Sequence, residues 1–167
     1  VGTETVLETE IFYTTKIEGA KTTRKRTSEI HSGAPIRDND YSEQMVKNCF
    51  GAVKYLNLHG NRLSEQILLT AWQILTENAC ENTSLGANGY RTSSNIQVGM
   101  YTPAPFTDVP TLMRKFIEFY NSQDMNDLPI IKAILMHYAF ETIHPFCDGN
   151  GRLGRLLLNN YLIGRGF

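Results

Sequence analysis

The chain of 167 residues is 41% hydrophobic and 20% charged, a balance typical of one globular domain with its own core, so we expect a single domain over residues 1–167. Its formal net charge of −1 leaves no basic excess, so we expect neither nucleic acid nor a membrane as a partner. The three cysteines lack C-x-x-C spacing, and no signal-peptide pattern or membrane-length apolar run is present, which indicates a cytoplasmic protein without a zinc site.

The spacing of apolar residues predicts that most of the chain is helical. In the N-terminal part we expect a short helix over residues 10–19 that ends at Gly19, followed by a solvated loop around the basic residues 21–26 and a loop over 32–39. Two longer helices should follow, one over residues 41–58 and one over 64–79 with Ser64 as its N-cap.

Residues 81–105 are rich in Gly, Ser, Thr, Asn and Pro, which predicts an irregular segment, and the alternation in residues 96–101 predicts a short strand or hairpin arm. Further along the chain, the helix expected over residues 130–143 is apolar on almost all its faces, so we expect it to be central and fully buried. Helix starts are expected at Thr107 or Asp108, with Pro110 in the first turn, and at Asp127 with Pro129.

A polar stretch, residues 144–155, separates this helix from a second apolar run. Pro145 disfavours the α region for His144, so the first helix should end there. Residues 148–151, Asp-Gly-Asn-Gly, are a turn signal, and a helix that begins near Gly151 would leave its first N–H groups free to bind an anion.

The side chains around this turn suit a polyphosphate. Arg152 and Arg155 lie three residues apart, so they share one helix face and can both donate to phosphate oxygens. Asp148 is an oxygen ligand that suits Mg²⁺ beside phosphates, and His144 is placed to act as a general base.

The stretch resembles the signature of the Fic family, H-P-F-x-D/E-G-N-G-R-x-x-R, at every specified position, from His144 and Phe146 to Arg155. The resemblance implies an all-α fold, a Fic-type helical bundle with a small β-hairpin flap over the active site. It also implies ATP as substrate, Mg²⁺ as cofactor, His144 as the catalytic base and Asp148 as the metal ligand. The nucleotide would be bound by Phe146, Gly149, Asn150, Gly151, Arg152, Arg155 and Ile96.

Residues 10–20 resemble the inhibitory-helix motif of many Fic proteins, S/T-x-x-x-E-G/N, with Thr14, Glu18 and Gly19 at the specified positions. In the family that glutamate pairs with the second signature arginine, here Arg155, and prevents productive binding of the ATP γ-phosphate. The resemblance therefore implies that Glu18 restrains the enzyme.

Residues 89–105 are similar to the family's flap, which docks the target segment by strand-like pairing. The resemblance places Ile96 toward the nucleotide base. The target would dock along Gln97, Val98, Gly99 and Met100.

The implied activity is protein adenylyltransfer, in which AMP moves from ATP to a Tyr, Thr or Ser hydroxyl of a target protein, with self-modification and an oligomer left open. A Doc-like kinase, transfer of UMP or phosphocholine, removal of AMP under control of the same glutamate, and a catalytically silent nucleotide-binding module stay open as alternatives. Kinases of the Doc type typically depart from the signature at its second glycine, where this chain has Gly151. The chain has no initiating Met and ends soon after the signature, so we expect C-terminal helices of the family beyond residue 167.

Overall fold

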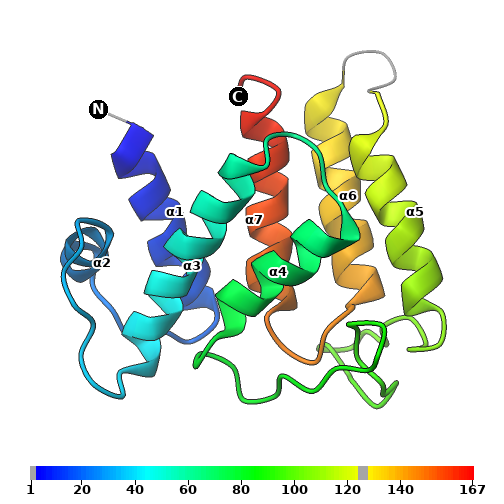
Figure 1. The fold of residues 1–167 in the computed structure, drawn as a ribbon, viewed down its shortest axis with the longest axis horizontal. Coiled ribbons are helices and arrows are strands. Elements are labelled where there is room, and N and C mark those ends of the chain that lie inside the picture. Colours follow the sequence, from blue (N-terminus) through cyan, green and yellow to red (C-terminus); the bar gives the residue numbers. More distant parts are fainter. Residues whose placement is uncertain (1–2, 124–127) are drawn as a thin grey trace.

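The computed structural model of the chain describes residues 3–123 and 128–167, and these form a bundle of helices (Figure 1). None of the helices in these ranges is long and apolar enough to cross a membrane. The helices are α1 (Thr3–Ile17), α2 (Arg24–His31), α3 (Tyr41–Leu58), α4 (Glu65–Thr76), α5 (Val109–Asn121), α6 (Pro129–Ile143) and α7 (Asn150–Ile163).

Helix α7 lies at the centre of the bundle and contacts α1, α3, α4 and α6 (Figure 1). It buries Leu153, Leu156 and Leu157 in the main core, together with Trp72 of α4 and Phe140 of α6. The N-terminus of α7 is therefore placed where the ends of α1, α4 and α6 meet. The all-α fold expected from the sequence is confirmed.

The N-terminal part is more helical than the sequence predicts. Helix α1 begins at Thr3, not near residue 10, and residues 24–26, half of the basic segment 21–26, belong to α2 and not to a loop. The Arg26 guanidinium donates to both carboxylate oxygens of Glu43, at 2.7 and 2.8 Å, and this pairing lowers the pKa of the buried Glu43 to about 2. The basic segment was misread because its stabilising partner lies on α3, outside the local sequence.

Helix α6 is not fully buried, so that prediction is wrong. Within the described residues α6 packs on α5 and α7, and its remaining face is exposed. That face carries Ile130, Ile131, Ile134, Leu135 and Tyr138, each 50 to 69% exposed.

Three helix ends differ in detail from the expectation. Helix α4 ends at Thr76 and not at residue 79. Asp108 occupies the N-cap of α5, with Pro110 in the first turn, but its side chain makes no capping hydrogen bond. The expected start at Asp127 lies outside the described residues, and α6 begins at Pro129.

The flap contains less β structure than expected. Within residues 89–105 the described backbone forms one antiparallel bridge, in which Val98 and Tyr101 exchange two N–H···O bonds of 3.0 Å. Gly99 turns the chain between them with a φ of 60°, a conformation that glycine adopts without strain. The predicted strand over residues 96–101 is thus reduced to a tight turn with one bridge.

Candidate active site

His144 follows the last residue of α6 in a left-handed conformation, with φ 50° and ψ 64°, and its backbone N–H donates to Phe140 O at 2.9 Å. The helix ends there as the following proline predicts. The buried Nδ1 of His144 has no hydrogen-bond partner among the described residues. Burial, with a further contribution from the positive charge of Arg91, lowers the pKa of His144, so the imidazole is neutral and able to accept a proton at neutral pH.

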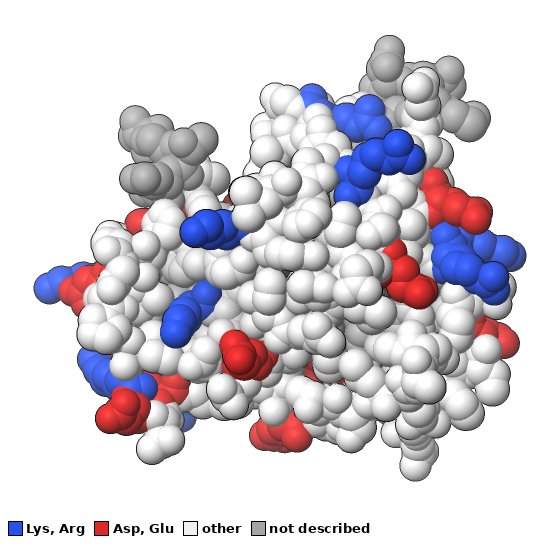
Figure 2. All heavy atoms as spheres, in the orientation of Figure 1, with Lys and Arg blue, Asp and Glu red and all other residues white. Residues whose placement is uncertain are grey.

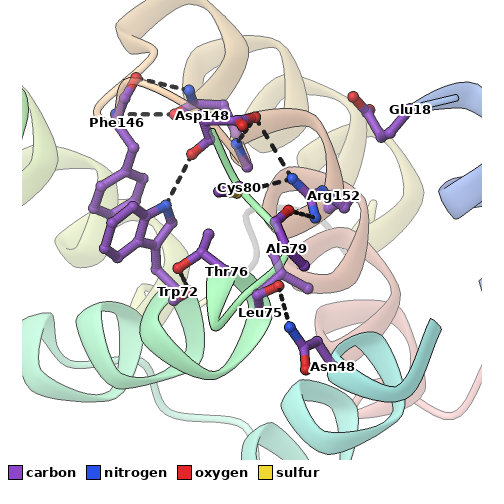
Figure 3. A network of polar contacts seen from close by, with 12 residues as sticks. Glu18, Asn48, Trp72, Leu75, Thr76, Ala79, Cys80, Phe146, Asp148 and Arg152 are labelled. Carbon is purple, nitrogen blue, oxygen red and sulfur yellow. Dashed lines mark hydrogen bonds and ion pairs between the residues drawn. The ribbon is translucent and has the colours of Figure 1, made fainter. Parts of the chain in front are cut away.

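The loop after His144 is held closed by its own residues. The Asn150 side chain accepts from Phe146 N at 3.0 Å and donates to Phe146 O at 2.8 Å. The Phe146 ring is fully buried and stacks on Trp72, with centroids 4.6 Å apart. Trp72 also donates its indole N–H to Asp148 O at 2.9 Å (Figure 3). Phe146 and Asn150 thus hold the shape of the loop, and their roles in nucleotide binding stay predictions.

The N-terminus of α7 has the features of an anion site. Its N-cap, Gly149, has φ 80°, and no side chain caps the helix. A Cβ at Gly149 would lie 2.9 Å from Thr76 Cγ2, so both the left-handed backbone and the close approach to α4 require glycine. The N–H groups of the first turn have no acceptor within the helix, and the helix dipole adds partial positive charge.

Arg152 is buried at this end of α7, with 2% of its surface exposed. It donates to Ala79 O at 3.1 Å and to Cys80 Sγ at 3.0 Å, and it lies 3.5 Å from Asp148 Oδ1 (Figure 3). Its guanidinium therefore ties the end of α4 to α7 and orients the Asp148 carboxylate.

Arg155 faces α1 instead. Its Nε donates to Thr14 Oγ1 at 2.5 Å, and a terminal nitrogen pairs with the Glu18 carboxylate. The same carboxylate lies against the first turn of α7, because a Cβ added to Gly151 would be only 2.7 Å from Glu18 Oε1. An anionic group thus already occupies the place where the α7 N-terminus and Arg155 converge.

The comparisons with known proteins agree with this geometry. Residues 62–162 match the family model described as the Fic/DOC family. The chain belongs to that family.

A probable protein adenylyltransferase from Aquifex aeolicus is 41% identical over 90 residues, which are 52% of this chain and 28% of that protein. The protein adenylyltransferase Fic from Drosophila ananassae is 29% identical over 164 residues, 94% of this chain and 32% of that protein. A structure of Fic-1 from C. elegans superposes with a TM-score of 0.80 at 25% identity, over 99% of this chain and 50% of that chain. The chain therefore spans about a third or less of these curated relatives.

The structure brings together the signature residues and the predicted inhibitory segment of this Fic chain. Thr14 and Glu18 reach Arg155, and Gly19 follows α1 with φ 90°. Of the flap residues predicted to contact the nucleotide or the target, Ile96 is half-buried, and Gln97, Val98, Gly99 and Met100 are exposed. The roles of these five residues stay predictions.

Three residues contribute to this Fic site although the sequence predicted no role in it for them. Trp72 lies in the core and also donates to the loop carbonyl of Asp148. Cys80 contacts Arg152, and the buried Arg91 binds the His144 carbonyl at 2.6 Å. Their partners are backbone groups and distant side chains, which leave no local pattern. Arg91 lies in the segment 89–105 that resembles the flap, but the resemblance did not indicate this contact.

Proposed function

We propose that this Fic chain is a protein adenylyltransferase that moves AMP from ATP to a Tyr, Thr or Ser hydroxyl of a target protein, and that Glu18 restrains it. The observation that carries the proposal is the convergence of a neutral, partly buried His144 and an uncapped α7 N-terminus on one loop, with the Glu18 carboxylate already at that terminus. The curated relatives named above are protein adenylyltransferases.

His144 acts as the general base. Its imidazole takes the proton of the target hydroxyl as the oxygen attacks the α-phosphorus of ATP, and the bond to the pyrophosphate oxygen breaks. AMP is then esterified to the target, and pyrophosphate leaves. The lowered pKa of His144 keeps the base unprotonated at neutral pH, where it is needed.

The α7 N-terminus binds the phosphates. The N–H groups of Gly151 and Arg152 point out of the first turn, and preorganised donors of this kind stabilise charge that develops during transfer. Arg155 binds the terminal phosphates when Glu18 does not occupy it. Arg152 holds the Asp148 carboxylate and the end of α4 in place, and its predicted contact with the phosphates stays part of the proposal.

Mg²⁺ fits the residues present. The Asp148 side chain is 35% exposed, and Mg²⁺ in nucleotide sites is held by one or two carboxylates together with phosphate oxygens. Asp148 would hold the ion, which supplies charge neutralisation for the phosphates when bound.

Glu18 inhibits by competition. Its carboxylate occupies Arg155 and the first turn of α7, which are the groups that the terminal phosphate needs. A single charge-assisted hydrogen bond contributes roughly 1.5 to 3 kcal/mol, about a tenfold or larger effect on occupancy. Removal of AMP under the control of Glu18 stays an alternative activity.

Gly151 favours AMP transfer over a Doc-like kinase activity, whose signature typically departs at this glycine. A Cβ at this position would lie 2.7 Å from Glu18 Oε1 and 3.1 Å from the Arg155 guanidinium, so the ends of these two side chains would have to shift to make room for it. We also propose a reducing, cytoplasmic setting, which fits the free thiols of Cys49, Cys80 and Cys147.

The test is incubation of the unmodified chain, Glu18→Gly and His144→Ala with Mg²⁺ and ATP, followed by intact mass spectrometry for self-modification. We expect an AMP-sized mass gain in Glu18→Gly, a smaller gain in the unmodified chain and none in His144→Ala. An EDTA sample of Glu18→Gly should show no gain.

The competing functions give different masses. A phosphate-sized gain would replace the proposal with the kinase, and transfer of the γ-phosphate label to protein would support that change. Binding of ATP without product on the chain or on added proteins from a cell extract would indicate the silent module.

A further inference from the structure

The last carbonyl groups of α6 are bound by residues of the flap. The Thr142 carbonyl accepts from the Ala104 N–H at 3.2 Å and from the Tyr101 hydroxyl at 2.9 Å. The carbonyls of Ile143 and His144 accept from the Arg91 guanidinium at 3.1 and 2.6 Å. Carbonyls at a helix C-terminus have no partner within the helix, so the flap is the C-terminal cap of the helix that leads into His144.

Arg91 is the centre of this cap. It is 1% exposed, and its guanidinium also donates to Ser93 O at 2.6 Å and to Ala104 O. Its backbone N–H donates to Pro145 O at 2.9 Å. One side chain thus joins both ends of the flap, at Ser93 and Ala104, to the backbone on both sides of the His144 peptide.

The chemistry of this contact suits arginine alone. Every side-chain partner of Arg91 among the described residues is a backbone carbonyl, and the planar guanidinium offers five donors in a fixed fork. A cation is favourable at a helix C-terminus because the helix dipole is negative there. Lysine would keep the charge but lose the fork.

We propose that Arg91 is a positioning residue for AMP transfer: it fixes the backbone of His144 and both ends of the flap in one frame, so that the base meets the hydroxyl of a target docked on the flap. The inference rests on the proposed function of His144 and of the flap. Misplacement of a catalytic group by about 1 Å costs on the order of 100-fold in rate. A residue that sets the position of His144 relative to the flap therefore affects the transfer step itself.

The experiment compares Arg91→Lys with Arg114→Lys, both in the Glu18→Gly background. Arg114 is exposed on α5 and bonds to Thr111 within its own helix, so its replacement controls for loss of a guanidinium. We expect kcat for AMP transfer to fall about 100-fold in Arg91→Lys, with KM for ATP near the parent value, because the phosphates bind at α7. Arg114→Lys should match the parent. An unchanged kcat in folded Arg91→Lys, or a loss explained by the unfolded fraction seen in circular dichroism, would overturn the inference.

Tyr101→Phe removes one flap-to-α6 bond without opening the core, since the Tyr101 side chain is 40% exposed. We expect its kcat to fall about threefold to tenfold at unchanged KM for ATP. If Arg91→Lys does not fold, an unchanged kcat in Tyr101→Phe overturns the inference.

A measurement that does not depend on activity separates the positioning role of Arg91 from the proposed function of the chain. Absence of AMP product in the Glu18→Gly parent contradicts the proposed function, not the Arg91 contacts. In that event the proton resonance of His144 Cε1 decides: we expect it to shift or broaden in Tyr101→Phe and Arg91→Lys, and not in Arg114→Lys. An unchanged His144 resonance in both flap variants overturns the positioning role.

Discussion

The two arginines of the signature lie three residues apart on α7 but have different surroundings. Arg152 is 2% exposed and is held by Ala79, Cys80 and Asp148, which belong to the α4–α7 corner. Arg155 keeps 27% of its side chain exposed and is held by Thr14 and Glu18 of the α1 segment.

The difference separates a permanent contact from a removable one. The partners of Arg152 are a backbone carbonyl, a thiol and a carboxylate of its own loop, and the guanidinium that contacts them is itself buried. Those of Arg155 come from one segment at the edge of the bundle, on the opposite side of α7 from α6 (Figure 1). The first arginine therefore builds the site, and the second is available for control.

The exterior gives no sign of a further charged site on the face seen in Figure 2, where basic and acidic side chains are interspersed over a mostly uncharged surface. This agrees with the net charge of −1. The charged contact that matters for the proposed reaction is thus local: it is the ion pair between the Arg155 guanidinium and the Glu18 carboxylate.

The largest expected effect is on stability. Arg152→Ala should lower the free energy of unfolding by about 3 kcal/mol, because it leaves buried partners unsatisfied, whereas Arg155→Ala should cost about 1 kcal/mol or less. Urea unfolding followed by fluorescence of Trp72, the single tryptophan, measures both. Equal losses in the two variants would remove the distinction between the arginines.

The next effect is on ATP binding. Glu18→Gln keeps the side-chain length but removes the charge that competes for Arg155, so the Kd for ATP should fall about tenfold. Titration calorimetry with Mg²⁺ present measures it. Glu29→Gln is the control, since the Glu29 side chain is 43% exposed and pairs only with Arg26 of its own helix among the described residues. An equal change in both variants would mean that general charge, not the Arg155 contact, sets the affinity.

The sequence predicted the loop better than its surroundings. The end of α6 at His144, the left-handed Gly149 and the start of α7 follow from local rules for proline, glycine and helix termini, and the structure has all three. The unequal burial of Arg152 and Arg155 was not predictable, because it depends on Ala79 and on α1, which lie far from α7 in the chain.

The missed helix α2 has the same cause. Only Thr27 and Ile30 of α2 are buried, so the segment lacks an apolar periodicity, and the Arg26–Glu43 pair that fixes it spans 17 residues. The exposed face of α6 shows the converse error: apolar composition indicated burial, but no described element covers that face. Local patterns thus set the helix ends, and tertiary partners set the burial.

The smallest effect concerns Thr14, whose hydroxyl accepts the Nε–H of Arg155 at 2.5 Å. Thr14→Val keeps the shape and removes this acceptor, so α1 should hold Arg155 less firmly and the rate of AMP transfer should rise about threefold. The matched control is Thr15→Val on the same turn, because among the described residues the Thr15 hydroxyl bonds only to the carbonyls of Ile11 and Phe12 within α1. Initial rates of both variants, measured in the presence of Glu18, decide the matter. A rise in Thr15→Val as large as in Thr14→Val would trace the release to a loosened α1 helix, whereas a rise confined to Thr14→Val ties it to the contact with Arg155.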